Sequence, residues 1–130
     1  MKLYRPVGLK ELELIIASDY MAFPPRLPEQ PIFYPVMNFE YAEQITREWN
    51  VPTPPYAGFV TSFTIDDAFL EKYPVKTVGG KMHQELWIPA EELDEFNARI
   101  IGKIEVTAAY YGDLFSEPVS PETNLPQRLS

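Results

Sequence analysis

The stretch Gln84-Glu85-Leu86-Trp87-Ile88-Pro89 places one carboxylate among apolar residues. Side chains alternate between the two faces of a β-strand, so Leu86 and Ile88 share one face while Glu85 and Trp87 share the other. A carboxylate beside an indole on a partly apolar face favours a cleft over open solvent. The alternative interpretation is an edge strand, with Glu85 in water and Trp87 half covered.

The segments that flank this strand differ in character. Thr77-Val78-Gly79-Gly80-Lys81 precedes it, and its paired glycines indicate a flexible loop. Pro89 suits the first turn of a helix, and the acidic residues 91–95 suit a helix N-terminus. We expect Leu93 and Phe96 to face inward from that helix.

The N-terminal part alternates short strands and helices. Met1 to Arg5 is predicted to be a short strand that Pro6 ends, because proline lacks the backbone N–H. Apolar residues then recur at helical spacing and predict a helix over about 8–18. A proline-rich loop over 19–31 and a short strand over 32–34 follow.

A second helix is expected after residue 38. Asn38 is a suitable N-cap, since its side-chain oxygen can accept from a free N–H of the first turn. Helical spacing predicts that the inner face of this helix is formed by Phe39, Ala42, Ile45 and Trp49.

The remaining elements are mostly strands. Residues 58–65 are rich in β-branched and aromatic side chains and predict a buried strand. Asp66-Asp67 is expected to cap a short helix that runs to Tyr73. Residues 75–78 suggest a weak strand, and 101–111 a last strand.

The amino-acid composition argues against several classes of function. The 130 residues are 45% hydrophobic, which suits one domain with a real core, and the formal net charge is −8. An acidic surface repels phosphate groups, so we expect no nucleic acid partner, and a dinucleotide would need local donors such as Arg5, Arg26 or Lys81. The chain has no cysteine and a single histidine, His83, so we expect no metal site.

We therefore expect an α+β protein of about six short strands and two or three helices. Residues 1–111 form a single domain, and 112–130 form a proline-rich tail that is either mobile or wrapped around the domain. Charges interrupt the apolar positions of residues 1–16, so we expect no signal peptide. With apolar runs too short for a membrane span, a cytoplasmic protein without a membrane partner is the expectation.

Several catalytic motifs are absent or incomplete. Gly79-Gly80-Lys81 lacks the spacing of a phosphate-binding loop. Ser62 has no histidine nearby in sequence, so a hydrolytic triad is unsupported. The acidic residues 90–95 are best explained as a solvated helix face.

The order of several segments resembles the ADP-ribosyltransferase fold, an NAD-binding split β-sheet. The segments are Leu3-Tyr4-Arg5-Pro6, Ala22-Phe23-Pro24-Pro25, Pro31-Ile32-Phe33-Tyr34 and Glu85-Leu86-Trp87-Ile88-Pro89, which together cover about residues 1–110. In that family the first strand carries an Arg or His, a later short strand a Tyr or Ser, and a Glu opens a strand of the type Glu-aliphatic-aliphatic-aliphatic-Pro. The chain also looks like members of a small bacterial group of similar length.

The resemblance implies an NAD-dependent mono-ADP-ribosyltransferase or NAD-cleaving enzyme. Glu85 would be the catalytic carboxylate, because a carboxylate on the ribose 2′-hydroxyl stabilises an oxocarbenium-like state. Arg5 would hold the nicotinamide ribose or a phosphate. Tyr34 or Phe33 would stack on the nicotinamide ring. NAD would be a substrate, with the acceptor unspecified and a protein among the candidates.

Three positions depart from the family pattern. Relatives usually have Gly after the strand Arg or His, and Pro6 removes the N–H there. His83 stands two residues before Glu85, where relatives that modify protein side chains often have Glu or Gln; it is a further cofactor-binding candidate. Phe33 takes the usual Tyr position by close alignment, which leaves Tyr34 and Phe33 as alternatives.

Two other functions remain open. One is a catalytically inactive binding or regulatory module on the same fold, which Pro6 and the proline-rich loops favour. The other is a transferase of phosphate from RNA ends to NAD on a related fold, which would need a basic cleft that the charge of −8 disfavours. The oligomeric state is left open.

Overall fold

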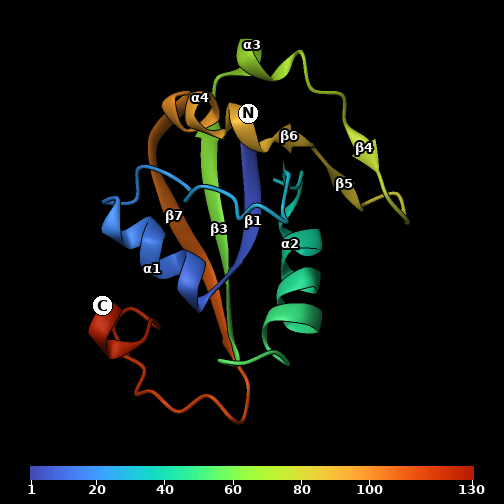
Figure 1. Cartoon of the computed structure of the whole chain (residues 1–130). Coiled ribbons are helices and arrows are strands. Elements are labelled where there is room, and N and C mark those ends of the chain that lie inside the picture. The colour runs from blue at the N-terminus through green and yellow to red at the C-terminus, as the bar shows by residue number, and fades with distance from the viewer.

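An antiparallel sheet with the strand order β1-β3-β7 forms the centre of the computed structural model, which describes residues 1–130 (Figure 1). The strands are β1 (Lys2–Gly8), β3 (Ala57–Ile65) and β7 (Ile100–Tyr111). All residues of β3 except Thr64 are buried, which confirms the predicted buried strand over 58–65. The protein is a mixed α+β chain, as expected.

Strand β1 continues through Pro6, so the prediction that Pro6 ends the strand is wrong. Pro6 lies opposite Val60 in the β1–β3 ladder, and Gly8 lies opposite Gly58. Tyr4 exchanges two backbone hydrogen bonds with Val36 on the other edge of β1. Backbone groups alternate in direction along a strand, so Pro6, two residues on, also presents its backbone nitrogen to that other edge. The missing N–H therefore breaks no bond to β3.

Two helices cover opposite faces of this sheet (Figure 1): α1 (Leu9–Ala17) and α2 (Phe39–Ile45). Helix α1 confirms the helix predicted over about 8–18 and buries Leu9, Leu12 and Ile15. Asn38 caps α2 as predicted, because its Oδ1 accepts a 2.7 Å hydrogen bond from the Tyr41 N–H.

Helix α2 ends in a π-helical turn, η1 (Thr46–Asn50). The N–H of Val51 donates to the carbonyl of Thr46, five residues earlier, at 3.0 Å. Such a turn contains one more residue than an α-turn, which changes the face that later residues occupy. Thr46 is fully buried while Trp49 is 69% exposed, so the prediction that Trp49 lies on the inner face is wrong.

Short strand pairs extend the structure beyond β1. Strand β2 (Ile32–Phe33) pairs with β6 (Ile88–Pro89), and β4 (Lys76–Thr77) pairs with β5 (Gln84–Glu85). Val36 forms single bridges to Tyr4 of β1 and to Glu85 of β5. The strand predicted over 83–88 is thus divided between β5 and β6, although Leu86 and Ile88 are both buried, as predicted from their common face.

Four α-helices are present, against the two or three expected. Two of them are short: α3 (Asp67–Leu70), which Asp66 caps as expected through the Phe69 N–H but which ends before Tyr73, and α4 (Leu93–Ala98), which lies in the acidic segment where a helix is expected. A 3₁₀ turn, η2 (Ala90–Glu92), leads into α4. Leu93 and Phe96 face inward, as predicted.

The main core contains a group of aromatic rings that pack edge to face or tilted against one another. Phe33 lies 5.0 Å from Phe23 and 5.3 Å from Phe96, measured between ring centroids. Phe63 contacts the same two neighbours. Such pairs add about 0.5–1.5 kcal/mol each beyond area burial, so this group anchors the loop after α1 to β2, β3 and α4.

Residues 112–130 fold back along the domain and end near α1 (Figure 1). Leu125 joins the main core, and the 3₁₀ turn η3 (Gln127–Leu129) carries Arg128, which bonds to Glu13 of α1 and to Glu117. None of the helices has the length and apolar character needed to cross a bilayer.

Candidate functional site

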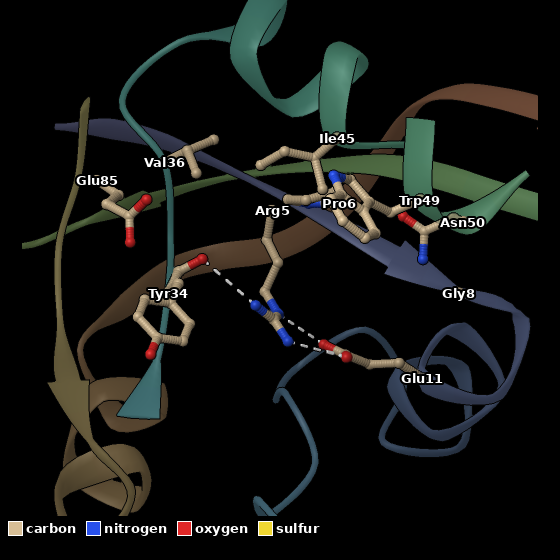
Figure 2. A pocket seen from close by; sticks show the side chains of 10 residues that line it. All are labelled: Arg5, Pro6, Gly8, Glu11, Tyr34, Val36, Ile45, Trp49, Asn50 and Glu85. Carbon is tan, nitrogen blue, oxygen red and sulfur yellow. Dashed lines mark hydrogen bonds and ion pairs between the residues drawn. The ribbon is translucent and has the colours of Figure 1, made fainter. Parts of the chain in front are cut away.

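A pocket of about 360 Å³ lies beside the edge of β1 that β3 leaves free. It is lined by residues from β1, α1, the segment after β2, the end of α2 with η1, and β5. Figure 2 shows Arg5 near its middle, with Glu85 on one side and Trp49 on the other. Arg5, Tyr34 and Glu85, three of the residues predicted from sequence to form a site, therefore line one cavity.

Arg5 is almost fully buried, and its guanidinium is held from two sides. Its Nε and Nη2 donate to the two carboxylate oxygens of Glu11 at 2.7 and 3.0 Å, and Nη1 donates to the carbonyl of Tyr34 at 3.3 Å (Figure 2). The carbon Cζ lies 4.5 Å from the ring centroid of Phe33. A guanidinium has five N–H groups, so two of them keep no protein acceptor.

Arg26 is the second guanidinium in this region. Its Cζ lies 6.0 Å from the ring centroid of Phe33, the same ring that supports Arg5. The Nε of Arg26 is buried and has no hydrogen-bond partner. Burial lowers the pKa of Arg26, and the neighbouring charge of Arg5 lowers it further. Arg26 does not itself line the pocket, whose charged lining residues are Arg5, Glu11 and Glu85.

Glu85 is 8% exposed, and both of its carboxylate oxygens accept a hydrogen bond from an aromatic side chain. The Tyr41 hydroxyl donates to Oε1 at 2.8 Å, and Trp87 Nε1 donates to Oε2 at 2.8 Å. A carboxylate offers about four acceptor positions, so each oxygen keeps one position for a ligand. Burial and the hydrogen bond to Glu85 raise the pKa of Tyr41 to about 12, so its hydroxyl remains a donor at neutral pH.

The two alternative ring-stacking residues occupy different environments. Tyr34 lines the pocket, is partly exposed, and packs edge-on against Trp87 with 6.3 Å between ring centroids. Phe33 is 1% exposed and belongs to the core, beneath Arg5. Of the two, only Tyr34 lines the pocket.

His83 does not line the pocket. Its Nδ1 accepts from the Gly80 N–H at 3.2 Å, so the proton on the neutral ring is on Nε2, which lies 2.9 Å from Gln44 Oε1. The ring stacks on Tyr41 with 4.8 Å between centroids. His83 therefore packs on the residue that bonds to Glu85 and makes no hydrogen bond to Glu85 itself.

Three residues of this site were not singled out from the sequence. Glu11 and Tyr41 belong to no motif, and the helical spacing predicts that Trp49 lies on an inner helix face. Glu11 is the only one with a local signal, since it lies one helical turn into the helix that follows the Arg5 strand.

Comparison with protein-family models, curated proteins and solved structures finds no match to this chain. No group of three or more His, Cys, Asp or Glu side chains is arranged to hold a metal ion. The assignment of a function consequently rests on the geometry of the pocket.

Proposed function

We propose that the protein is an NAD-dependent mono-ADP-ribosyltransferase or NAD-cleaving enzyme. The observation that carries the proposal is the convergence of Arg5, Tyr34 and Glu85 on one pocket. These residues are far apart in sequence, and a buried carboxylate beside a buried guanidinium is costly unless both have a role or a full set of partners.

The chemistry suits a buried carboxylate. The bond between nicotinamide and C1′ of the ribose breaks, nicotinamide leaves as a neutral molecule with the electron pair, and positive charge develops on the ribose. Glu85 accepts a hydrogen bond from the ribose 2′-hydroxyl and stabilises that charge, an effect typically of several kcal/mol. Water or an acceptor group then attacks C1′ and releases its proton to solvent.

The surroundings supply the other contacts that NAD needs. Tyr34 offers a partly exposed ring for the nicotinamide, and the free N–H groups of Arg5 face a diphosphate. Arg26, which shares the Phe33 ring with Arg5, lies outside the pocket lining and leaves its Nε without a hydrogen-bond partner. Val36 bridges Tyr4 of β1 and Glu85 of β5, so the β4–β5 pair lies beside the main sheet. A second small strand pair next to the main sheet supports the proposal of a split sheet like that of the ADP-ribosyltransferase fold.

The test is release of labelled nicotinamide from NAD and transfer of label to lysate acceptors. Wild type should release nicotinamide, and Glu85→Gln, which keeps the shape but loses the charge, should not. Glu71→Gln is the matched control, since Glu71 is exposed and lies outside the pocket. Equal release by wild type and Glu85→Gln, or none above a protein-free sample, would refute the proposal.

A second candidate is a non-catalytic binding module on the same architecture. It is favoured by the protein partners that both charged groups already have, since Glu11 binds Arg5 and two aromatic donors bind Glu85. Pro6 also removes one N–H from the edge that lines the pocket. This candidate predicts that neither NAD binding by calorimetry nor nicotinamide release is detected.

A further inference from the structure

Trp49 is the largest apolar side chain that the protein leaves open to solvent beside the pocket. It is 69% exposed, although an α-helical continuation of α2 would place it inward. Isolated exposed apolar residues need no explanation, but an exposed indole that lines a pocket containing an arginine and two glutamates is a candidate ligand contact.

The backbone holds Trp49 in this position. The π-turn lets Thr46 occupy the buried place, and Gly58 of β3 allows the turn to approach closely. A Cβ at residue 58 would lie 2.5 Å from Thr46 Cγ2 and 2.7 Å from Asn50 Cβ. The Thr53 hydroxyl also donates to the Trp49 carbonyl at 2.6 Å. The backbone that carries the indole is thus held by the close approach of the turn to Gly58 and by the Thr53 hydrogen bond.

We propose that Trp49 is a stacking surface for the adenine base of a nucleoside diphosphate. The inference rests on the proposed function, which sets the end of the ligand that lies at Glu85. If the ribose that is cleaved lies at Glu85, the diphosphate passes Arg5, and the remaining planar group reaches the Trp49 side of the pocket (Figure 2). Base–aromatic stacking does not require specific hydrogen bonds, so a bare indole is sufficient.

Titration with ADP tests this inference without requiring catalysis. ADP should quench the tryptophan fluorescence of wild type. Trp49→Phe keeps a stacking ring, so calorimetry should give an ADP dissociation constant within a few-fold of wild type while most of the quenching disappears. Trp49→Ala should weaken ADP binding about tenfold or more, the usual cost of losing one base stack.

Leu114→Ala is the matched control. Leu114 is also 69% exposed but lies outside this pocket, so its removal should leave the ADP dissociation constant unchanged. Nicotinamide mononucleotide, which lacks adenine, should bind wild type and Trp49→Ala equally. Melting temperatures of all variants check that the exposed substitutions leave the fold intact.

The outcomes separate this inference from the proposed function. If ADP does not bind wild type, or binds Trp49→Ala as tightly as wild type, the adenine surface is refuted. If Trp49→Ala weakens the binding of nicotinamide mononucleotide and not that of ADP, the nicotinamide end of the ligand lies at Trp49, and the inference is also refuted. If Trp49 governs ADP binding but no nicotinamide is released from NAD, the adenine surface stands and the catalytic proposal fails.

Discussion

The Tyr41 hydroxyl donates a 2.8 Å hydrogen bond to Oε1 of Glu85, from a helix 44 residues earlier in the chain. Tyr41 does not line the pocket, so it orients the Glu85 carboxylate but does not itself contact a bound ligand. Hydrogen bonds to charged groups contribute about 1.5–3 kcal/mol. We expect Tyr41→Phe to lower the kcat of nicotinamide release about tenfold or more, with the KM for NAD little changed.

Tyr110→Phe is the control for that prediction. The Tyr110 hydroxyl also donates to a glutamate, Glu43 of α2, but neither residue lines the pocket. Tyr110→Phe should lower the free energy of unfolding about as much as Tyr41→Phe does and leave kcat unchanged. A similar loss of kcat in both variants would show that the effect is a general loss of rigidity.

Alkaline pH should destabilise the protein. Tyrosine ionises near pH 10 in an unfolded chain, whereas burial and the charge of Glu117 raise the pKa of Tyr111 to about 12. Because its pKa is higher in the folded protein, Tyr111 keeps its proton there at a pH where the unfolded chain loses it. The resulting contribution of Tyr111 to stability is complete below about pH 10 and is lost by about pH 12. Tyr111 also donates to the Asn124 carbonyl at 2.7 Å, which joins the tail to β7.

Melting temperatures between pH 8 and pH 12 measure this effect. Tyr111→Phe should flatten the alkaline decline, because one ionising group is removed. An unchanged slope in Tyr111→Phe would contradict the assignment.

The ion pair between Arg5 and Glu11 should matter more for stability than another pair on the same helix. Both side chains of the pair are largely buried, and removing Glu11 leaves the Arg5 charge without its partner. We expect Glu11→Gln to lower the free energy of unfolding by about 2 kcal/mol or more. Urea denaturation measures the change.

Glu13→Gln provides the comparison on α1. Glu13 pairs with Arg128, whose side chain is half exposed, and water screens such a pair, so Glu13→Gln should destabilise the protein much less than Glu11→Gln. Equal destabilisation by the two substitutions would show that burial does not distinguish them.

Gly58→Ala should disturb the contact between β3 and the π-turn. The added Cβ would overlap Thr46 and Asn50, and overpacking typically costs about 1–3 kcal/mol. Gly80→Ala is the control, because its Cβ would meet nothing closer than 3.8 Å. Chemical denaturation should show destabilisation in the first variant and a change within about 0.5 kcal/mol in the second. If Gly58→Ala is neutral, the turn is looser than the structure indicates.

Local patterns in the sequence were sufficient for most individual elements. The apolar period predicted α1, the side chain of Asn38 predicted the start of α2, and the β-branched run predicted β3. The alternation of side chains along a strand predicted that Leu86 and Ile88 share one face, and both are buried. These features depend on helix and strand periodicity and on capping, which act over a few residues.

Tertiary contacts decided the rest. Pro6 remains within β1 because its nitrogen faces the edge of the strand that β3 leaves free, and Trp49 faces solvent because the π-turn packs against Gly58. Tyr41 and Glu11 reach Glu85 and Arg5 only after the strands and helices are assembled. The sequence by itself determined which segments become helices and strands. The convergence of Arg5, Tyr34 and Glu85 on one pocket comes from contacts between residues that are distant along the chain and therefore leave no local pattern.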